Sequence, residues 1–334
     1  MSLTLLAIFT PKASLRRAAR VLPWLLLLTT HATVLYAAPS NPNPQPLARP
    51  EISARAAVLL NPVSGQILFA KDPHRRLPQA STTKVMTTLL ALEYLDLNTK
   101  IPVSQGAADT EPSRIGLRAG EMMYVHDLLY GLMLKSGNDA AEVIAEAISG
   151  SVAGFARLMN AKAQQLGAVN TSFRNPHGLD AKGHYSTAYD LVLIFRHAME
   201  NPVFAEIVRT RRASLRVESG YRSEHWRFVP VRNTNRLLTS YPGANGGKTG
   251  YTSKARRCYV GEVQRGSTRL IVSLLGSTRR WQDAKALLDY GFAYYGRGRP
   301  SAPPANQHAR VVEPLKLISA APSARLTENQ HPVN

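Results

Sequence analysis

The amino-acid sequence predicts an α/β fold of the α+β kind, in which strands from both ends of the chain form an antiparallel sheet around a helical subdomain. Segments with strand composition occur at residues 56–70 and again from residue 212 onward. Helical patterns occupy most of the region between them. A doubly wound parallel sheet would instead require strands and helices in regular alternation, which this sequence lacks.

The first ordered element is expected to be a β-hairpin. Residues 56–60 and 66–70 are apolar and strand-like, and the sequence Asn61-Pro62-Val63-Ser64-Gly65 lies between them. Pro, Asn, Ser and Gly are the residues that tight turns favour, so this segment predicts a five-residue hairpin turn.

The helical region begins with a segment at 81–97 that is apolar on nearly every side. Such a helix belongs inside a domain. Pro78 lies just before it, and Ser81, Thr82 or Thr83 is expected to cap its first turn. Residues 100–120 are expected to be irregular and 170–185 to form a long loop. Further helices are expected at 125–135, 139–148, 155–166, 186–198 with Ser186 as its cap, and from Pro202 onward.

After residue 212 the pattern changes to strands. Their expected ranges are 213–217, 226–231, 244–251, 258–263 and 269–275, and a closing amphipathic helix follows at 281–295. The fourth and fifth of these strands alternate like a pair about the turn at Arg265-Gly266. The late strands are therefore expected to complete the sheet that the hairpin begins.

The chain divides into four predicted parts. Residues 1–37 have a basic start and an apolar run, which indicates a signal peptide or, if uncleaved, a membrane anchor. Residues 38–52 form a proline-rich linker, and 53–296 form the main folded domain. Residues 297–334 form a low-complexity tail with one strand-like patch at 309–318. The protein is expected to be exported, to the periplasm or the extracytoplasmic face of the cell membrane.

The charge balance is strongly basic, with a formal net charge of +19 at pH 7, of which four charges lie in residues 1–37. An arginine-rich surface explains this surplus more simply than a dedicated site for an anionic polymer. No basic block alternates with aromatic residues, so nucleic acid is not an expected partner. Cys258 is the single cysteine, which excludes an intrachain disulfide, and it is expected to be buried.

A possible nucleophile and its base stand at the start of the apolar helix. Ser81 and Lys84 are three residues apart, so on a helix they lie on one face and touch. Burial lowers the pKa of a lysine, and a neutral amine can accept a serine proton. This pattern alone is weak, because an N-cap followed by a surface lysine also produces it.

Two further motifs strengthen that interpretation. Ser136-Gly137-Asn138 lies between two predicted helices, and Lys248-Thr249-Gly250 lies at the start of a predicted strand. Ser-x-x-Lys, Ser-Asp-Asn and Lys-Thr-Gly are the joint signature of penicillin-binding proteins and class A β-lactamases. All three occur here in that order, with Gly137 in place of the aspartate.

The chain therefore resembles the low-molecular-weight penicillin-binding proteins, which are serine D-alanyl-D-alanine carboxypeptidases of peptidase family S11. The resemblance covers roughly residues 55–296. Three longer segments also look like that family: Leu134 to Ala141, Asn175 to Asp180, and Gly247 to Thr252. It implies a β-lactamase/transpeptidase-like fold. The implied substrate is a peptidoglycan stem peptide that ends in D-Ala-D-Ala, and β-lactam antibiotics are the implied inhibitors.

The resemblance also implies a role for each motif residue. Ser81 attacks the substrate carbonyl, Lys84 takes its proton, and Ser136 passes a proton to the leaving amine. Lys84 is kept neutral by burial and by the charge of Lys248. The implied substrate-binding residues are Asn138, Lys248, Thr249 and Gly250, and the implied oxyanion hole consists of the backbone N–H groups of Ser81 and Tyr251.

No cofactor is implied. His177 and His184 lie in one loop, but a third ligand is not evident, so a structural role is expected in place of a metal site.

The sequence alone leaves several other functions open. A class A β-lactamase would need a glutamate on the loop at 168–180, which has none. A DD-endopeptidase of the same family is a closer alternative. A nucleotide-binding protein with a phosphate loop before Lys248 would need glycine at the position of Pro242. A non-catalytic wall-binding protein is a further alternative, and it would not be acylated at Ser81 by a labelled penicillin. Larger family members carry a second β-rich domain, for which residues 297–334 are too short and too rich in proline.

Overall fold

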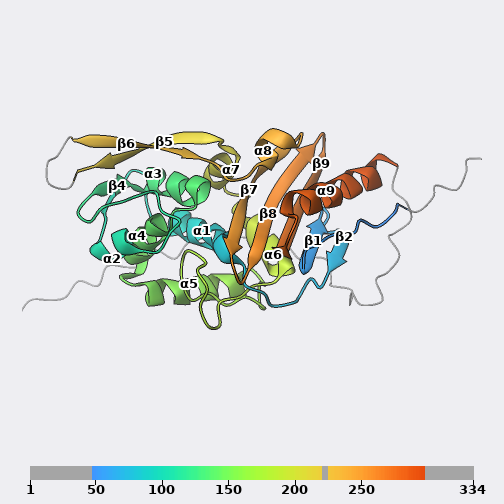
Figure 1. Ribbon diagram of the computed structural model, residues 1–334, viewed down its shortest axis with the longest axis horizontal. Helices are drawn as coiled ribbons and strands as arrows, with labels where there is room; N and C mark the ends of the chain where they lie inside the picture. The colour runs from blue at the N-terminus through green and yellow to red at the C-terminus, as the bar shows by residue number, and fades with distance from the viewer. Residues whose placement is uncertain (1–46, 220–224, 298–334) are drawn as a thin grey trace, which may run out of the picture. The chain divides into compact units, whose positions relative to one another are not determined.

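The computed structural model describes residues 47–219 and 225–297, which contain two antiparallel sheets and the helices packed against them (Figure 1). The first sheet has the strand order β2-β1-β9-β8-β7. Its members are β1 (Ala56–Leu60), β2 (Ile67–Lys71), β7 (Ala244–Thr252), β8 (Arg256–Arg265) and β9 (Thr268–Ser277). Early and late strands therefore share one sheet, as the sequence predicts.

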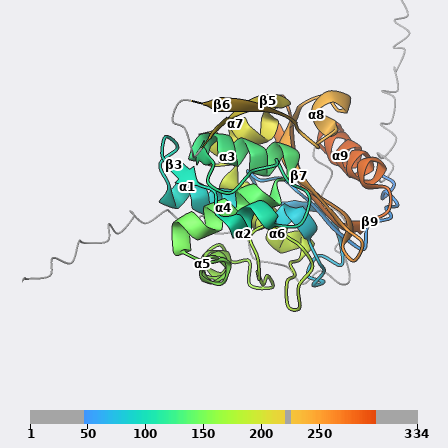
Figure 2. The ribbon, with the colours of Figure 1, turned by 60° about the vertical axis from the view of Figure 1, so that its left-hand side comes forward.

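This sheet is covered on both faces. Helix α9 (Arg280–Gly296) packs on one face, where Leu287 and Leu288 join Leu59 and Val272 in a buried cluster. The other face packs against α6 (Ala188–Ala198), and α1 (Lys84–Tyr94) belongs to the same buried cluster. Figure 2 shows α9 on the side of the sheet opposite the helical region. Strand β1 is buried along its whole length because it lies between these two layers.

The helical region packs around α1, which is buried from Lys84 to Ala91. This confirms the interpretation of an internal helix. The other elements are α2 (Gln105–Asp109), α3 (Val125–Tyr130), a π-helical turn η2 (Gly131–Lys135), α4 (Asn138–Ser149), α5 (Val152–Gln165), α7 (Pro202–Arg209) and α8 (Leu237–Ser240).

A second sheet lies beside the helical region and differs from the expectation of a single sheet. It has the order β3-β4-β5-β6 and comprises β3 (Lys100–Pro102), β4 (Met122–Tyr124), β5 (Arg212–Glu218) and β6 (Trp226–Arg232). The two short strands are three residues each and lie at or just beyond the ends of the segment 100–120 that was expected to be irregular. Such short strands carry too little local pattern to be predicted from sequence.

Two predicted helix caps are wrong. A 3₁₀ turn, η1 (Ala80–Thr83), precedes α1, and neither Ser81 nor Thr83 caps the helix with its side chain. Thr82 Oγ1 instead donates to the carbonyl of Gln79 at 2.7 Å. At α6 the cap is Thr187, whose hydroxyl accepts from the Asp190 N–H, and Ser186 precedes it. Short α8 was not predicted.

The ends of the predicted domain scheme are only partly described. Leu47 and Ile52, from the predicted linker, pack partly buried against the cluster beneath α9. Residues 1–46 and 298–334, including the predicted signal segment and the strand-like patch at 309–318, lie outside the described residues. Within 47–219 and 225–297, no helix has both the length and the apolar character of a membrane span.

Candidate active site

The predicted nucleophile lies in the turn η1, at the edge of strand β7. Its neighbour Ala80 adopts φ = 50°, a left-handed conformation that is uncommon for a residue with a side chain. Two glycines allow the close packing around this turn. A Cβ at Gly178 would lie 2.0 Å from the Ala80 carbonyl oxygen, and a Cβ at Gly250 would lie 3.0 Å from the Ser81 nitrogen. The 170–185 loop and β7 thus hold the turn between them.

Lys84 is fully buried and makes three contacts through its amine. Nζ lies 3.1 Å from Ser81 Oγ, 2.7 Å from Asn138 Oδ1 and 2.7 Å from the carbonyl oxygen of His177. The predicted contact between Ser81 and Lys84 is confirmed. The amide oxygen and the carbonyl can only accept hydrogen bonds. A neutral amine has two N–H groups for these two acceptors, which leaves its lone pair directed at the hydroxyl of Ser81.

Burial places the pKa of Lys84 well below its ordinary value. Desolvation is the largest cause, because the charged ammonium loses its water, and the positive charge of Lys248 lowers the pKa further. Asp139 acts in the opposite direction, but more weakly. The site can therefore hold Lys84 as a neutral base.

Ser136 lies at the end of η2 and faces the second lysine. Its backbone is left-handed, with φ = 68° and ψ = 38°, which turns the chain between η2 and α4. Lys248 Nζ donates to Ser136 Oγ at 3.0 Å, although the two residues are 112 positions apart. The predicted second and third motifs are thus in direct contact.

Gly137, where the common motif has aspartate, lies against the carboxylate of Asp139. A Cβ at position 137 would lie 2.7 Å from Asp139 Oδ1. That carboxylate is already occupied: it accepts hydrogen bonds from the backbone N–H groups of Ile115, Gly116 and Leu117. Asp139 thereby fastens the 113–117 loop to α4, and glycine leaves room for it.

Asn138 is held at both ends of its amide. Its Nδ2 donates to the carbonyl of Glu111 at 2.8 Å, while its Oδ1 accepts from Lys84. This fixes the orientation of the amide, so that an acceptor faces Lys84. The arrangement is suited to hold the amine of Lys84 in place.

Lys248 is also fully buried, and together with the nearby Arg280 it makes this end of the candidate site cationic. Burial and the nearby Arg280 lower the pKa of Lys248 to about 7. Thr249 follows it on β7, and its hydroxyl lies 2.7 Å from that of Thr234. The pair of hydroxyls and the buried amine are suited to bind a carboxylate.

The edge of β7 is supported from α9. Arg280 Nη1 donates to the carbonyls of Gly250 and Cys258, at 3.0 and 3.1 Å. Tyr251, the next residue, keeps 61% of its surface exposed. Cys258 is fully buried, as predicted.

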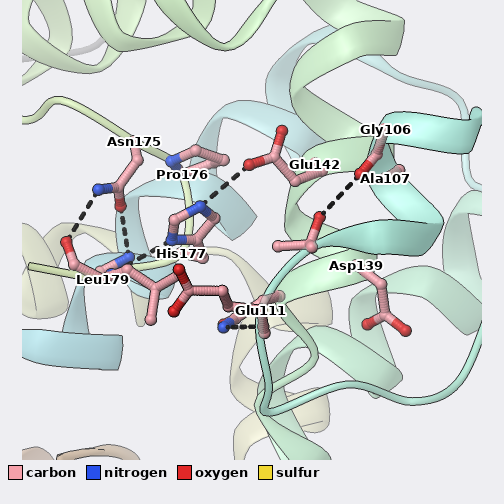
Figure 3. A network of polar contacts seen from close by, with 12 residues as sticks. Gly106, Ala107, Glu111, Asp139, Glu142, Asn175, Pro176, His177 and Leu179 are labelled. Atoms are coloured by element: carbon pink, nitrogen blue, oxygen red, sulfur yellow. Dashed lines mark hydrogen bonds and ion pairs between the residues drawn. The ribbon is translucent and has the colours of Figure 1, made fainter. Parts of the chain in front are cut away.

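The loop beneath the site is ordered by its own hydrogen bonds (Figure 3). His177 Nδ1 accepts from the Leu179 N–H, so its Nε2 carries the proton and donates to Glu142 at 3.0 Å. Asn175 bridges the same turn, because it accepts from Gly178 and donates to Leu179. This network presents the His177 carbonyl to Lys84.

His184 lies behind the nucleophile turn. Its Nδ1 accepts from the Arg174 N–H, and its Nε2 lies 3.0 Å from Gln79 and from Thr83 Oγ1. Burial lowers its pKa to about 3. Neither histidine belongs to a group of three potential metal ligands within the described part of the chain.

The comparison with protein families matches residues 43–279 to a model described as D-alanyl-D-alanine carboxypeptidase, Peptidase_S11. This chain belongs to peptidase family S11.

Curated S11 relatives extend over most of the chain. DacB2 of Mycobacterium tuberculosis is 40% identical over 252 residues, which are 73% of this chain and 84% of the relative. DacF of Bacillus subtilis is 37% identical over 278 residues, which are 81% of this chain and 69% of the relative. Both are named D-alanyl-D-alanine carboxypeptidases.

Solved structures show the same fold for this S11 chain. The Streptomyces K15 DD-transpeptidase aligns with a TM-score of 0.71 at 34% identity and covers 74% of this chain and 100% of its own. A penicillin-binding protein homologue from Mycobacterium tuberculosis, Rv2911, aligns with a TM-score of 0.68 at 39% identity over 73% of this chain and 93% of its own. The predicted fold class is thereby confirmed.

Sequence reasoning missed several residues of this S11 site. Thr234 and Arg280 reach it from outside the three motifs, and Glu111 and His177 contribute only backbone carbonyls. A backbone carbonyl leaves no side-chain signal. Arg280 could have been singled out only as a cation at the start of the closing helix.

Proposed function

We propose that Ser81 is the acylated nucleophile of a serine D-Ala-D-Ala carboxypeptidase, which removes the terminal D-alanine from peptidoglycan stem pentapeptides. The observation that carries this proposal is the environment of Lys84. Its amine lies 3.1 Å from Ser81 Oγ, while two pure acceptors occupy its other directions. A serine with a buried neutral amine beside it is an activated nucleophile.

Acylation then takes the following course. The Ser81 proton passes to Lys84 Nζ as Oγ bonds to the carbonyl carbon of the penultimate D-alanine. The backbone N–H groups of Ser81 and Tyr251 stabilise the oxyanion, with about 3–4 kcal/mol for each donor. Ser136 Oγ relays that proton: it gives its own proton to the leaving nitrogen and takes the proton held by Lys84 Nζ in exchange, the C–N bond breaks, and D-alanine departs. Water later cleaves the ester and restores Ser81.

The free terminal carboxylate is the group that the cationic end of the cleft would recognise. Lys248 and Thr249, supported by Thr234, provide one cation and two hydroxyls there. Gly250 allows the substrate backbone to approach the strand edge. A bound carboxylate favours the protonated form of Lys248, so substrate binding and the ammonium charge reinforce each other.

β-Lactams are proposed as covalent inhibitors that acylate the same serine. The 168–180 loop has no glutamate to activate a deacylating water, so the acyl-enzyme is expected to persist. Gel fluorescence after incubation with a labelled penicillin measures this directly, and a Ser81→Ala variant is the matched control.

The decisive experiment is incubation with a muropentapeptide followed by mass spectrometry. Loss of one D-alanine by the wild type, and none by Ser81→Ala, supports the proposal. Equal activity in Ser81→Ala contradicts the mechanism. Splitting of crosslinked dimers without release of D-alanine favours a DD-endopeptidase, and rapid turnover of penicillin favours a β-lactamase.

We also infer that the protein acts outside the cytoplasm. The basic start and apolar run within residues 1–37 support export, and a peptidoglycan substrate would require it. N-terminal sequencing of the protein from cells distinguishes a cleaved signal from a retained anchor. A full-length protein recovered from the cytosol would contradict export.

A further inference from the structure

The second sheet has one face without a covering element. Side chains alternate along β5, so that Leu215 and Val217 are buried while Arg212 and Arg216 are exposed. Helix α3 and η2 lie against the inner face. In Figures 1 and 2, no described helix or strand covers the opposite face of β5 and β6. We call this surface, with Arg212, Arg216, Trp226, Phe228 and Arg232, the outer face.

The outer face exposes aromatic side chains along one strand. Phe228 keeps 64% of its surface exposed, Trp226 keeps 36%, and both alternate on β6 with less exposed neighbours. Pro230 continues the same row. A row of adjacent exposed apolar side chains rimmed by charged residues is the kind of patch that marks an interaction surface.

The outer face also carries two arginines that are not paired with any residue in the described part of the chain. Arg212 and Arg232 stand directly opposite each other in the β5–β6 register. Neither guanidinium has a hydrogen bond or ion pair within the described residues, whereas Arg216 is bound by Asp127 at 3.0 Å. Like charges at directly opposed positions repel each other. An anion between the two guanidinium groups would relieve this repulsion.

We propose that the outer face docks on an anionic phospholipid surface. Arg212 and Arg232 would bind headgroup phosphates, Phe228 would enter the boundary between headgroups and acyl chains, and Trp226 would lie beside it at the level of the headgroups. Cations beside exposed aromatic rings are the pattern of proteins that lie on membrane interfaces. The charge of the pair is complementary to the lipid surface, and two arginines add to the attraction independently of any lipid specificity.

A polysaccharide strand fits this surface less well. Sugars stack on free aromatic faces, but here the rings of Tyr124 and Trp226 are already covered. Lys100 Nζ lies 5.3 and 5.0 Å from their centroids, and Arg216 lies 4.9 Å from that of Tyr124. Phe228 is thus the ring on this face most available to a partner, and an acyl chain suits it better than a sugar.

The strand that carries the outer face leads directly into the candidate active site. Strand β6 ends at Arg232, and two residues later Thr234 contacts Thr249. The outer face and the cationic end of the cleft therefore share one continuous segment. A protein docked by β6 would hold that end of the cleft close to the lipid surface.

The test measures partition of the full chain into vesicles by sedimentation. Vesicles of phosphatidylcholine alone are compared with vesicles that contain about 30% phosphatidylglycerol. Relative to wild type, the Arg212→Gln/Arg232→Gln variant is expected to bind the anionic vesicles at least about tenfold more weakly. Phe228→Ser is expected to weaken binding several-fold. Trp226 should show a blue-shifted emission on binding that Trp226→Phe lacks.

A matched double variant controls for loss of charge alone. Arg157→Gln/Lys254→Gln removes two exposed cations from other elements and should bind nearly as wild type does, because charges beyond a Debye length of about 8 Å are screened. Thermal unfolding midpoints verify that each variant is folded. All variants keep residues 1–46, so any binding by that segment is common to them.

Three results would overturn the proposal. The first is equal binding by wild type and Arg212→Gln/Arg232→Gln. The second is an equal loss in the control pair, which would indicate diffuse attraction. The third is retention by an anionic wall polymer with no binding to vesicles. Each result is independent of whether the protein cleaves peptides, because no step measures catalysis.

Discussion

The buried amine of Lys248 lowers the pKa of the buried amine of Lys84, although 164 positions separate them in the chain. Each lysine is fully buried, and each contacts the hydroxyl of a different serine. One buried amine therefore both contacts Ser136 and lowers the pKa of the second buried amine, that of Lys84.

Removal of the Lys248 charge should shift the pH profile of acylation. Without that charge the protonated form of Lys84 is penalised less, so its pKa rises. Less of the amine is then neutral at a given pH. The acid limb of the acylation rate is expected to move to higher pH in Lys248→Gln. Acylation rates are measured with a fluorescent penicillin from pH 5 to 10, which is about the range where a shifted lysine titrates. The midpoint of the acid limb is then read from the plot of rate against pH.

Lys248→Arg is the control, because it keeps the charge while it changes the shape of the donor. Its acid limb should stay near that of wild type even if its absolute rate falls. Superimposable limbs in Lys248→Gln and Lys248→Arg would contradict electrostatic coupling between the lysines.

Replacement of Gly178 should displace the nucleophile turn. Gly178→Ala adds a Cβ at 2.0 Å from the Ala80 carbonyl oxygen, at a position with φ = 93°. The expected cost is about 3 kcal/mol or more in the free energy of unfolding, with a large fall in the acylation rate. Urea unfolding and penicillin labelling measure both quantities.

Gly65→Ala separates the clash from the backbone strain. Gly65 also has a positive φ, of 73°, but an added Cβ meets nothing within 4 Å. Its cost should be about 1 kcal/mol, with normal acylation. Equal effects of the two substitutions would show that contact with Ala80 is unimportant.

The burial of His184 predicts a loss of stability in acid. Its pKa is lowered to about 3, while an unfolded histidine titrates near 6.5. Between these values the unfolded chain binds more protons than the folded chain, so stability falls as pH falls. This group alone can make the free energy of unfolding fall by about 1.4 kcal/mol for each pH unit. Urea unfolding at several pH values between about 7 and 4 measures it.

His184→Asn should flatten this slope, even though it lowers stability at neutral pH through lost hydrogen bonds. His126→Asn is a suitable control, because the side chain of His126 is 46% exposed. If the slope in His184→Asn equals that of wild type, then His184 is not the group that resists protonation.

The hydroxyl pair at the cleft end should affect substrate binding more than turnover. Thr234→Val removes the partner of the Thr249 hydroxyl and one possible donor to the substrate carboxylate. A rise in KM of about tenfold with a smaller change in kcat is expected, since one hydrogen bond to a charged group is lost.

Thr234→Ser retains the hydroxyl and should restore a KM near that of wild type. Steady-state release of D-alanine from a peptide ending in D-Ala-D-Ala measures both constants. The same KM in the serine and valine variants would exclude a polar role for Thr234.

Much of the fold could be predicted because its signals are local. The hairpin before residue 71, the apolar helix after Ser81 and the last three strands each show their own periodicity. Strands β3 and β4 could not be predicted, since three residues carry no period and their partners are distant. Assignment of β5 and β6 to a separate sheet was missed for a similar reason: strand composition does not specify the partner.

The sequence by itself determined the three motifs, their order, and the buried helix that lowers the pKa of Lys84. Those features depend on spacing within single elements, and backbone geometry sets which side chains share a face. Tertiary structure alone decided which distant residues form hydrogen bonds in the site. These pairs are Lys248 with Ser136, Thr234 with Thr249, Arg280 with the carbonyl of Gly250, and Lys84 with the carbonyl of His177. Such contacts join segments far apart in the chain. Their positions follow from how whole layers pack, a property that no local pattern encodes.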